Sequence, residues 1–215
     1  MKNVFKIFST IVLAVVFGIY FTTCDNSTSP NVGGDTRVDI ISFNDKQLYI
    51  DDTTIVPGTF NENISFLYFF VGDSYKINEF FTDYSVEVVN GKLSLDLGIP
   101  KTSALLPIKD SSGYSFGGVV SGTNADSVKG LIFIGIKSSE GNFAYAKPDW
   151  SFFTLFVYVD NEVKLEGDWF YDLVFNNITL NQGWNTLLVD NYDSDDSIRP
   201  VIKGAPASDY IWIID

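Results

Sequence analysis

The sequence lacks the side chains on which most nucleophilic and metal chemistry depends. It contains no histidine, and its single cysteine is Cys24. A histidine general base, a histidine-containing triad, a histidine-ligated zinc site and a thiol pair for redox chemistry are therefore excluded. The stretch Gly113-Tyr114-Ser115-Phe116-Gly117 matches a nucleophile elbow. Without a histidine base we interpret this match as chance, and we predict no enzymatic activity.

The densest group of carboxylates lies near the C-terminus. Asp190, Asp193, Asp195 and Asp196 could together offer several of the oxygen ligands that calcium prefers. The glycine and the closing glutamate of an EF-hand loop are absent from this stretch. A solvated acidic loop is the alternative, and calcium is the only cofactor for which we find candidate ligands.

Aromatic residues suggest a second kind of site. The chain has four tryptophans, Trp150, Trp169, Trp184 and Trp212, and eleven tyrosines. Exposed rings in a row would form a platform for a sugar, although aromatic residues in strands more often belong to the core. A hydrolase would have to use carboxylates alone, and spacing singles out no pair of them.

The charge balance narrows the class of partner. Acidic residues outnumber basic ones by 27 to 14, which gives a formal net charge of −13. A domain of this charge repels phosphate backbones. We therefore predict that it does not bind nucleic acid.

The N-terminus has the pattern of an export signal. Lys2 and Lys6 precede an uncharged, largely apolar run at residues 7–23, and the run stops at Cys24. Residues 24–36 follow as a polar segment rich in turn-forming residues, which predicts a flexible tether. We expect a signal peptide at residues 1–23; an uncut transmembrane anchor is the alternative, since the run just reaches the length that spans a bilayer.

Two short motifs resemble those of known bacterial lipoproteins. Phe21-Thr22-Thr23-Cys24 resembles a lipobox, with Phe21 where leucine is usual and Thr23 where a small residue is usual. Leu180-Asn181-Gln182-Gly183-Trp184-Asn185 resembles a turn found in uncharacterised envelope lipoproteins of spirochaetes and Bacteroidota. The resemblance implies lipidation at Cys24 and a place in the cell envelope, on the outer membrane or the periplasmic face of the inner membrane. Two or three acyl chains anchor a protein stably.

The rest of the chain, residues 37–215, is expected to form a single β-sandwich domain. Short apolar runs divided by turn residues predict an all-β fold, a sandwich or partly closed barrel of roughly ten antiparallel strands. The remaining strand candidates, besides two hairpins, are residues 38–43, 47–50, 64–71, 117–120, 130–136, 169–175, 184–189 and 210–214. Ile77, Phe80, Phe81 and Tyr84 have helical spacing and predict one short helix across a sheet end.

The clearest hairpin spans residues 85–97. Asn90-Gly91 supplies the two positive-φ positions of a type I′ turn. With that turn, Val88 faces Leu93 and Val86 faces Leu95, while Glu87 faces Ser94 on the opposite side of the hairpin. Turn chemistry and apolar pattern thus predict the same register.

A second hairpin is predicted at Asp160-Asn161. It would pair Val163 with Tyr158 and Leu165 with Phe156. The incoming strand, which ends at Val159, is apolar on both sides, which is typical of a strand buried on both faces.

These features lead to three functional hypotheses. The first is a lipid-anchored envelope protein whose non-catalytic β-sandwich binds an unknown protein partner, with its lipid inserted in the membrane. The second is a carbohydrate-binding module. The third is a hydrolase that uses only carboxylates.

Overall fold

The computed structural model describes residues 37–51, 53–68, 74–109, 119–121, 125–147, 151–168, 174–190, 201–204 and 210–214. The chain divides into two compact units, Met1–Asp35 and Thr36–Asp215, and all the described residues belong to the second. The expected signal peptide and Cys24 lie outside the described residues. Among those that are described, no helix is long and apolar enough to cross a membrane.

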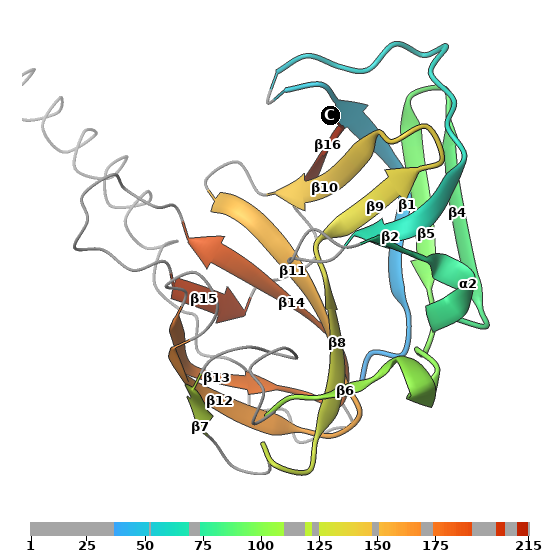
Figure 1. Cartoon of the computed structure of the whole chain (residues 1–215). Helices are drawn as coiled ribbons and strands as arrows, with labels where there is room; N and C mark the ends of the chain where they lie inside the picture. The colour runs from blue at the N-terminus through green and yellow to red at the C-terminus, as the bar shows by residue number, and fades with distance from the viewer. Residues whose placement is uncertain are drawn as a thin grey trace, which may run out of the picture. The chain divides into compact units, whose positions relative to one another are not determined.

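Two sheets of eight strands each build the domain (Figure 1). The first contains β1 (Ile41–Tyr49), β2 (Ile64–Tyr68), β3 (Ser74–Lys76), β4 (Tyr84–Val89), β5 (Lys92–Leu97), β9 (Gly135–Ser138), β10 (Phe143–Lys147) and β16 (Ile211–Ile214). The second contains β6 (Leu106–Pro107), β7 (Val119–Ser121), β8 (Lys129–Phe133), β11 (Ser151–Val159), β12 (Val163–Asp168), β13 (Val174–Leu180), β14 (Gly183–Asp190) and β15 (Val201–Gly204). The all-β prediction is confirmed.

Two details of the predicted sheet are wrong. The described residues hold more strands than the ten expected, because several strands are too short to leave a periodic pattern. The pairing is also not entirely antiparallel, since β1 runs parallel to β16 and β13 runs parallel to β15. The strands of the first parallel pair lie near opposite ends of the domain sequence, and β14 separates those of the second, so no local pattern reports either pairing.

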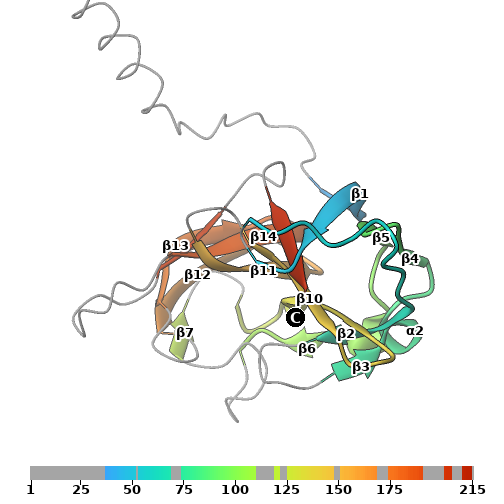
Figure 2. The same ribbon diagram turned by 90° about the horizontal axis from the view of Figure 1, so that it is seen from above.

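The strand orders are β3-β2-β9-β10-β16-β1-β5-β4 and β6-β8-β11-β14-β15-β13-β12-β7. The first sheet is curled, so that β2 near one end of the strand order approaches β4 at the other. The Glu62 N–H, just before β2, donates a 3.2 Å hydrogen bond to the carbonyl of Val88 in β4. Figure 2 shows the strands of the first sheet gathered in one half of the domain and β7, β12 and β13 of the second in the other.

Strand β11 lies between two hydrophobic clusters. Phe156 and Tyr158 face the cluster inside the first sheet, whereas Leu155, Val157 and Val159 face a cluster enclosed by the second sheet. All five side chains are buried. The prediction that this strand is buried on both faces is confirmed.

The Asn90-Gly91 hairpin forms as predicted. Strands β4 and β5 pair Val88 with Leu93, Val86 with Leu95 and Glu87 with Ser94. Asn90 and Gly91 have φ angles of 53° and 73°, as a type I′ turn requires.

The second predicted hairpin is wrong. Strand β11 pairs with β8 and β14 on its two edges, while β12 pairs with β13 and β7. Asp160 ends β11 at a corner, where its N–H donates to the Lys129 carbonyl and its carboxylate accepts from the Lys129 N–H. The chain therefore leaves β11 instead of folding back on it.

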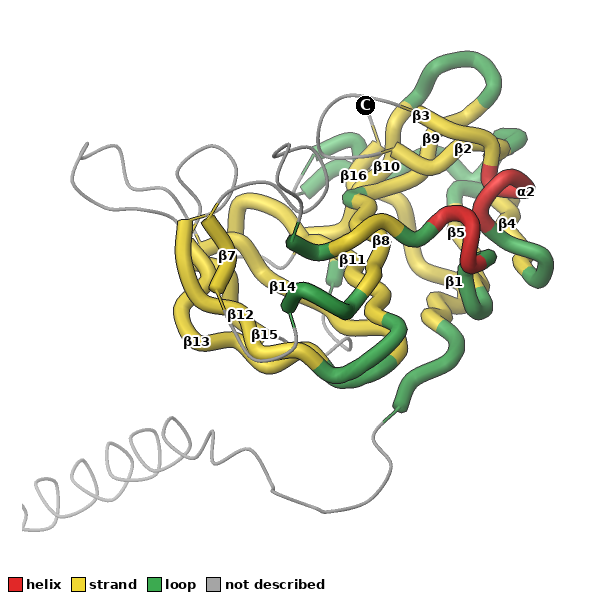
Figure 3. The backbone as a smooth tube through the Cα atoms, turned by 60° about the horizontal axis from the view of Figure 1, so that its bottom comes forward, coloured by secondary structure: helices red, strands yellow, loops and turns green. Residues whose placement is uncertain are grey.

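One further expectation needs correction, near β1. Residues 38–43 and 47–50, predicted as two strands, merge largely into β1, which carries a bulge between Phe43 and Lys46. The predicted short helix is confirmed as α2 (Ile77–Phe80), which is a single turn because Tyr84 already begins β4. It packs beside the short helix η1 (Thr102–Ala104), and both are red in Figure 3.

The loop after β1 yields a titration prediction. The N–H groups of Thr53 and Thr54 each donate 2.8 Å bonds to the Asp51 carboxylate. With the two threonine hydroxyls, they lower the pKa of Asp51 from 3.8 to about 2. The carboxylate therefore stabilises the fold above pH 3.8, and this contribution disappears as the pH falls through about 2.

We expect carbon-13 NMR to place the titration midpoint of the Asp51 carboxyl near 2. A second titration in an Asn90→Ala chain, which leaves the loop untouched, should give the same midpoint. A midpoint near that of an ordinary aspartate would show that the threonine hydrogen bonds do not form in solution.

Candidate functional site

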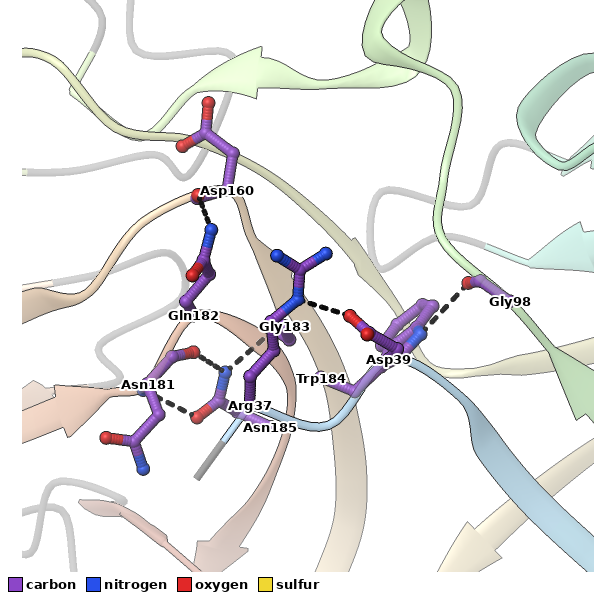
Figure 4. Close-up of polar contacts among 9 residues, drawn as sticks. All are labelled: Arg37, Asp39, Gly98, Asp160, Asn181, Gln182, Gly183, Trp184 and Asn185. Carbon is purple, nitrogen blue, oxygen red and sulfur yellow. Dashed lines mark hydrogen bonds and ion pairs between the residues drawn. The ribbon is translucent and has the colours of Figure 1, made fainter. Parts of the chain in front are cut away.

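The first described residues of the domain dock onto the turn before β14 (Figure 4). Val38 forms a parallel bridge with Gly183, and the Trp184 N–H donates a 2.8 Å hydrogen bond to the Val38 carbonyl. On either side of Val38, the Arg37 guanidinium forms an ion pair with the Asp39 carboxylate. The segment that follows the expected tether is thus attached at its very beginning.

Gly183 permits this close approach. Its φ of +98° is a conformation that side chains disfavour, and an added Cβ would lie 2.4 Å from the Val38 carbonyl oxygen. This glycine therefore makes room for a second backbone beside the turn.

Trp184 joins the two sheets at the same place. Its indole Nε1 donates a 3.1 Å bond to the Gly98 carbonyl, just after β5. Its ring centroid lies 5.7 Å from that of Phe133 and 5.5 Å from that of Tyr158. Burial raises the pKa of Tyr158.

Asn185 holds the turn itself. Its Nδ2 donates to the carbonyls of Asn181 at 2.8 Å and Gly183 at 3.1 Å, while its Oδ1 accepts from the Asn181 N–H at 2.9 Å. Gln182 donates to the Asp160 carbonyl at 2.9 Å. We call Val38, Gly98, Gly183, Trp184 and Asn185 the entry clamp.

A polar pocket lies on the outer side of β1, β5 and β4. It has a volume of about 320 Å³, and its lining residues are Asp45, Glu87, Val89, Asn90, Lys92 and Ser94. We call it the distal pocket, because these residues lie toward the Asn90-Gly91 turn, away from the Ile41 end of β1 where the clamp holds the chain.

Three of the lining residues form a row across the strands. Glu87 on β4 stands opposite Ser94 on β5, and the Asp45 N–H donates a 3.2 Å bond to the Ser94 hydroxyl. Asp45 takes this place because the bulge gives it a φ of 49°. Two interstrand spacings separate the backbones that carry the carboxylates, roughly 10 Å.

This arrangement suits a ligand with several polar groups. The carboxylates accept hydrogen bonds and attract cations, while Lys92 and Asn90 can donate. Among the residues that the structure describes, no group of three acidic, histidine or cysteine side chains could hold a metal ion.

The interpretation that the tryptophans belong to the core, rather than to a sugar platform, holds for the two tryptophans that the structure describes. Trp184 is 5% exposed and Trp212 is fully buried, so neither offers a ring face to a sugar. Their rings instead fill the core inside the first sheet, with Trp212 stacked on Phe156 at 6.0 Å. Trp150 and Trp169 lie outside the described residues.

The predicted calcium ligands cannot be placed. Asp193, Asp195 and Asp196 lie outside the described residues, and the structure describes only the backbone of Asp190, at the end of β14. Asp45 and Lys92 were not among the candidate site residues expected from the sequence. The alternation of the predicted hairpin already placed Glu87 and Ser94 on one polar face, whereas the bulge at Asp45 leaves no such signal.

Comparison of the chain with known protein families, with curated protein sequences and with solved structures finds no match. The site must therefore be interpreted from its own geometry.

Proposed function

We propose that this chain is a lipid-anchored cell-envelope protein, in which a non-catalytic β-sandwich module is held at a membrane by residues 24–36 and binds a cationic protein surface at the distal pocket. The distal pocket carries the proposal. It is a recessed, hydrogen-bonding surface in a domain whose assessable tryptophans are committed to the core.

The entry clamp supports the tethered arrangement. The apolar run, Cys24 and the polar segment up to residue 36 have the order of a lipoprotein signal and tether. The backbone is fixed at Val38, immediately after that segment. Because the backbone is hydrogen-bonded at this point, a tether attached there can hold the domain at the membrane without pulling its first segment away from the sheet.

Charge favours a basic partner. Two carboxylates and one ammonium group line the pocket, and the whole chain carries a net charge of −13. A partner rich in lysine and arginine would be steered to such a surface and could pair with Asp45 and Glu87.

The test compares two charge reversals. Glu87→Lys should weaken the binding of an oligolysine peptide by about tenfold, since one ion pair is lost and one repulsion gained, together about 1.4 kcal/mol. Glu162→Lys, at an exposed position outside the pocket, changes the net charge equally. Isothermal titration calorimetry measures the dissociation constant of the peptide for each variant. Equal weakening by the two substitutions would mean that only overall charge attracts the peptide.

The same pocket supports a second candidate, a carboxylate-only glycoside hydrolase. Carboxyl groups that invert a glycosidic centre lie roughly 6.5–9.5 Å apart, and Asp45 and Glu87 line one pocket on either side of Ser94. This candidate predicts release of reducing sugar from a bacterial polysaccharide, abolished by Glu87→Gln. The binding module predicts no release from either chain.

A further inference from the structure

We propose that three exposed aliphatic residues around the entry clamp rest on the membrane surface and orient the domain, with the distal pocket facing away from the bilayer. We call Val38, Ile40 and Ile99 the apolar collar. The inference rests on the proposed function, because it requires that the chain is anchored through Cys24.

The collar residues are among the large hydrophobic residues that the structure leaves exposed. Their exposed fractions are 47% for Val38, 56% for Ile40 and 46% for Ile99. Aliphatic side chains of this size gain free energy when they leave water. A nearby surface that can cover them is therefore favoured.

The three residues belong to one region of the fold. Ile41 pairs with Leu97, so the antiparallel register places Ile40 opposite Gly98, next to Ile99. Val38 and Gly98 are both hydrogen-bonded to Trp184, through its backbone N–H and its indole Nε1 respectively. Trp184 thus holds the backbone at Val38 and at Gly98, the chain neighbour of Ile99.

The clamp also keeps the collar exposed. The backbone at Val38 is pinned to Gly183 and the backbone at Gly98 is pinned to the indole. The aliphatic side chains therefore need no rearrangement to meet an outside surface, and little conformational entropy is lost in the encounter.

The tether selects the bilayer as the occupant of this surface. Residues 24–36 end next to Val38, and a polar chain of that length spans about 20 Å on average. The collar therefore stays within reach of the membrane. Along β1, Leu48 lies on the order of 26 Å from Ile40. The Asn90-Gly91 turn is hydrogen-bonded to Leu48, so this turn and the distal pocket lie at the end of β1 away from the collar.

The negative charge of the chain favours a bilayer with zwitterionic rather than anionic head groups. The chain has 27 acidic and 14 basic residues, so anionic head groups would push the domain outward. A zwitterionic surface such as phosphatidylcholine allows the aliphatic contact without this repulsion.

The experiment uses the full acylated chain in phosphatidylcholine vesicles. Ile40→Cys and Val89→Cys each introduce one labelling site at an exposed position, at the collar and at the distal pocket. An environment-sensitive dye at position 40 should be quenched several-fold more strongly by nitroxide-labelled phosphatidylcholine than the same dye at position 89. Val38→Ser with Ile99→Ser should remove most of this difference.

Ile50→Ser with Ile55→Ser is the matched control, because these isoleucines are 52% and 57% exposed but lie at the opposite end of β1. This pair should leave the quenching unchanged. Equal quenching at positions 40 and 89 in a chain that floats with the vesicles would overturn the orientation alone. Self-quenching between labelled copies at position 40 would instead assign the collar to a second copy of the chain.

Failure of the proposed function gives a different result. In a chain that is not acylated, Cys24 would itself accept the dye, whether or not that chain floats with the vesicles.

Discussion

Replacing Gly183 by alanine should lower the free energy of unfolding by about 3 kcal/mol or more, because two penalties add. The residue has a φ of +98°, and the new Cβ would meet the Val38 carbonyl oxygen at 2.4 Å, the Val38 nitrogen at 3.0 Å and its carbonyl carbon at 3.1 Å. All three contacts are with backbone, so no side chain can rotate away. Urea unfolding followed by tryptophan fluorescence measures the loss.

Gly141→Ala is the matched control. Gly141 has a similar φ of +105°, but an added Cβ would meet nothing within 4 Å. This variant should lose only the conformational part, roughly 1–2 kcal/mol. In Gly183→Ala, hydrogen exchange should also speed up at the Trp184 amide, which donates to Val38. Equal destabilisation by both substitutions would mean that the clamp does not depend on close approach.

Trp184→Phe should cost about 2 kcal/mol in unfolding free energy. The smaller ring leaves part of the core cluster unfilled, and the Gly98 carbonyl loses the indole donor at 3.1 Å. Thermal and urea unfolding should both register the change.

Trp212→Phe distinguishes the cost of the lost ring volume from the cost of the lost hydrogen bond. Trp212 is as deeply buried, but its Nε1 has no hydrogen-bond partner among the described residues. Its replacement therefore loses volume without losing a hydrogen bond, and the cost should be about 1 kcal/mol smaller than for Trp184→Phe. A larger cost for Trp212→Phe would contradict the role given to the bond to Gly98.

The two predicted hairpins show which parts of the fold could be read from the sequence. Asn90-Gly91 specifies its own turn, and the alternation on either side specifies the same register, so local information was sufficient. After Asp160 the chain carries no comparable turn, and β11 is apolar on both sides. The sequence of such a strand does not specify which strands pair with its two edges. In the structure these neighbours are β8 and β14.

The candidate site divides in the same way. The motif around Gly183 and Trp184 resembles a turn, and the chain turns there with a positive φ at Gly183. Its partners Val38 and Gly98 are distant in sequence, and hydrogen bonds to backbone carbonyls leave no trace in residue type. The distal pocket depends on a bulge that moves Asp45 beside Ser94, which breaks the alternation that sequence analysis uses.

The most direct test of the account is the mass of the mature N-terminal peptide from membranes of a bacterium that expresses the chain. Lipid attachment predicts that Cys24 is the first residue and carries two or three acyl chains. Recovery of a peptide that begins at Met1 with an unmodified thiol at Cys24 would contradict it, and the membrane arrangement proposed for the domain would then have no support.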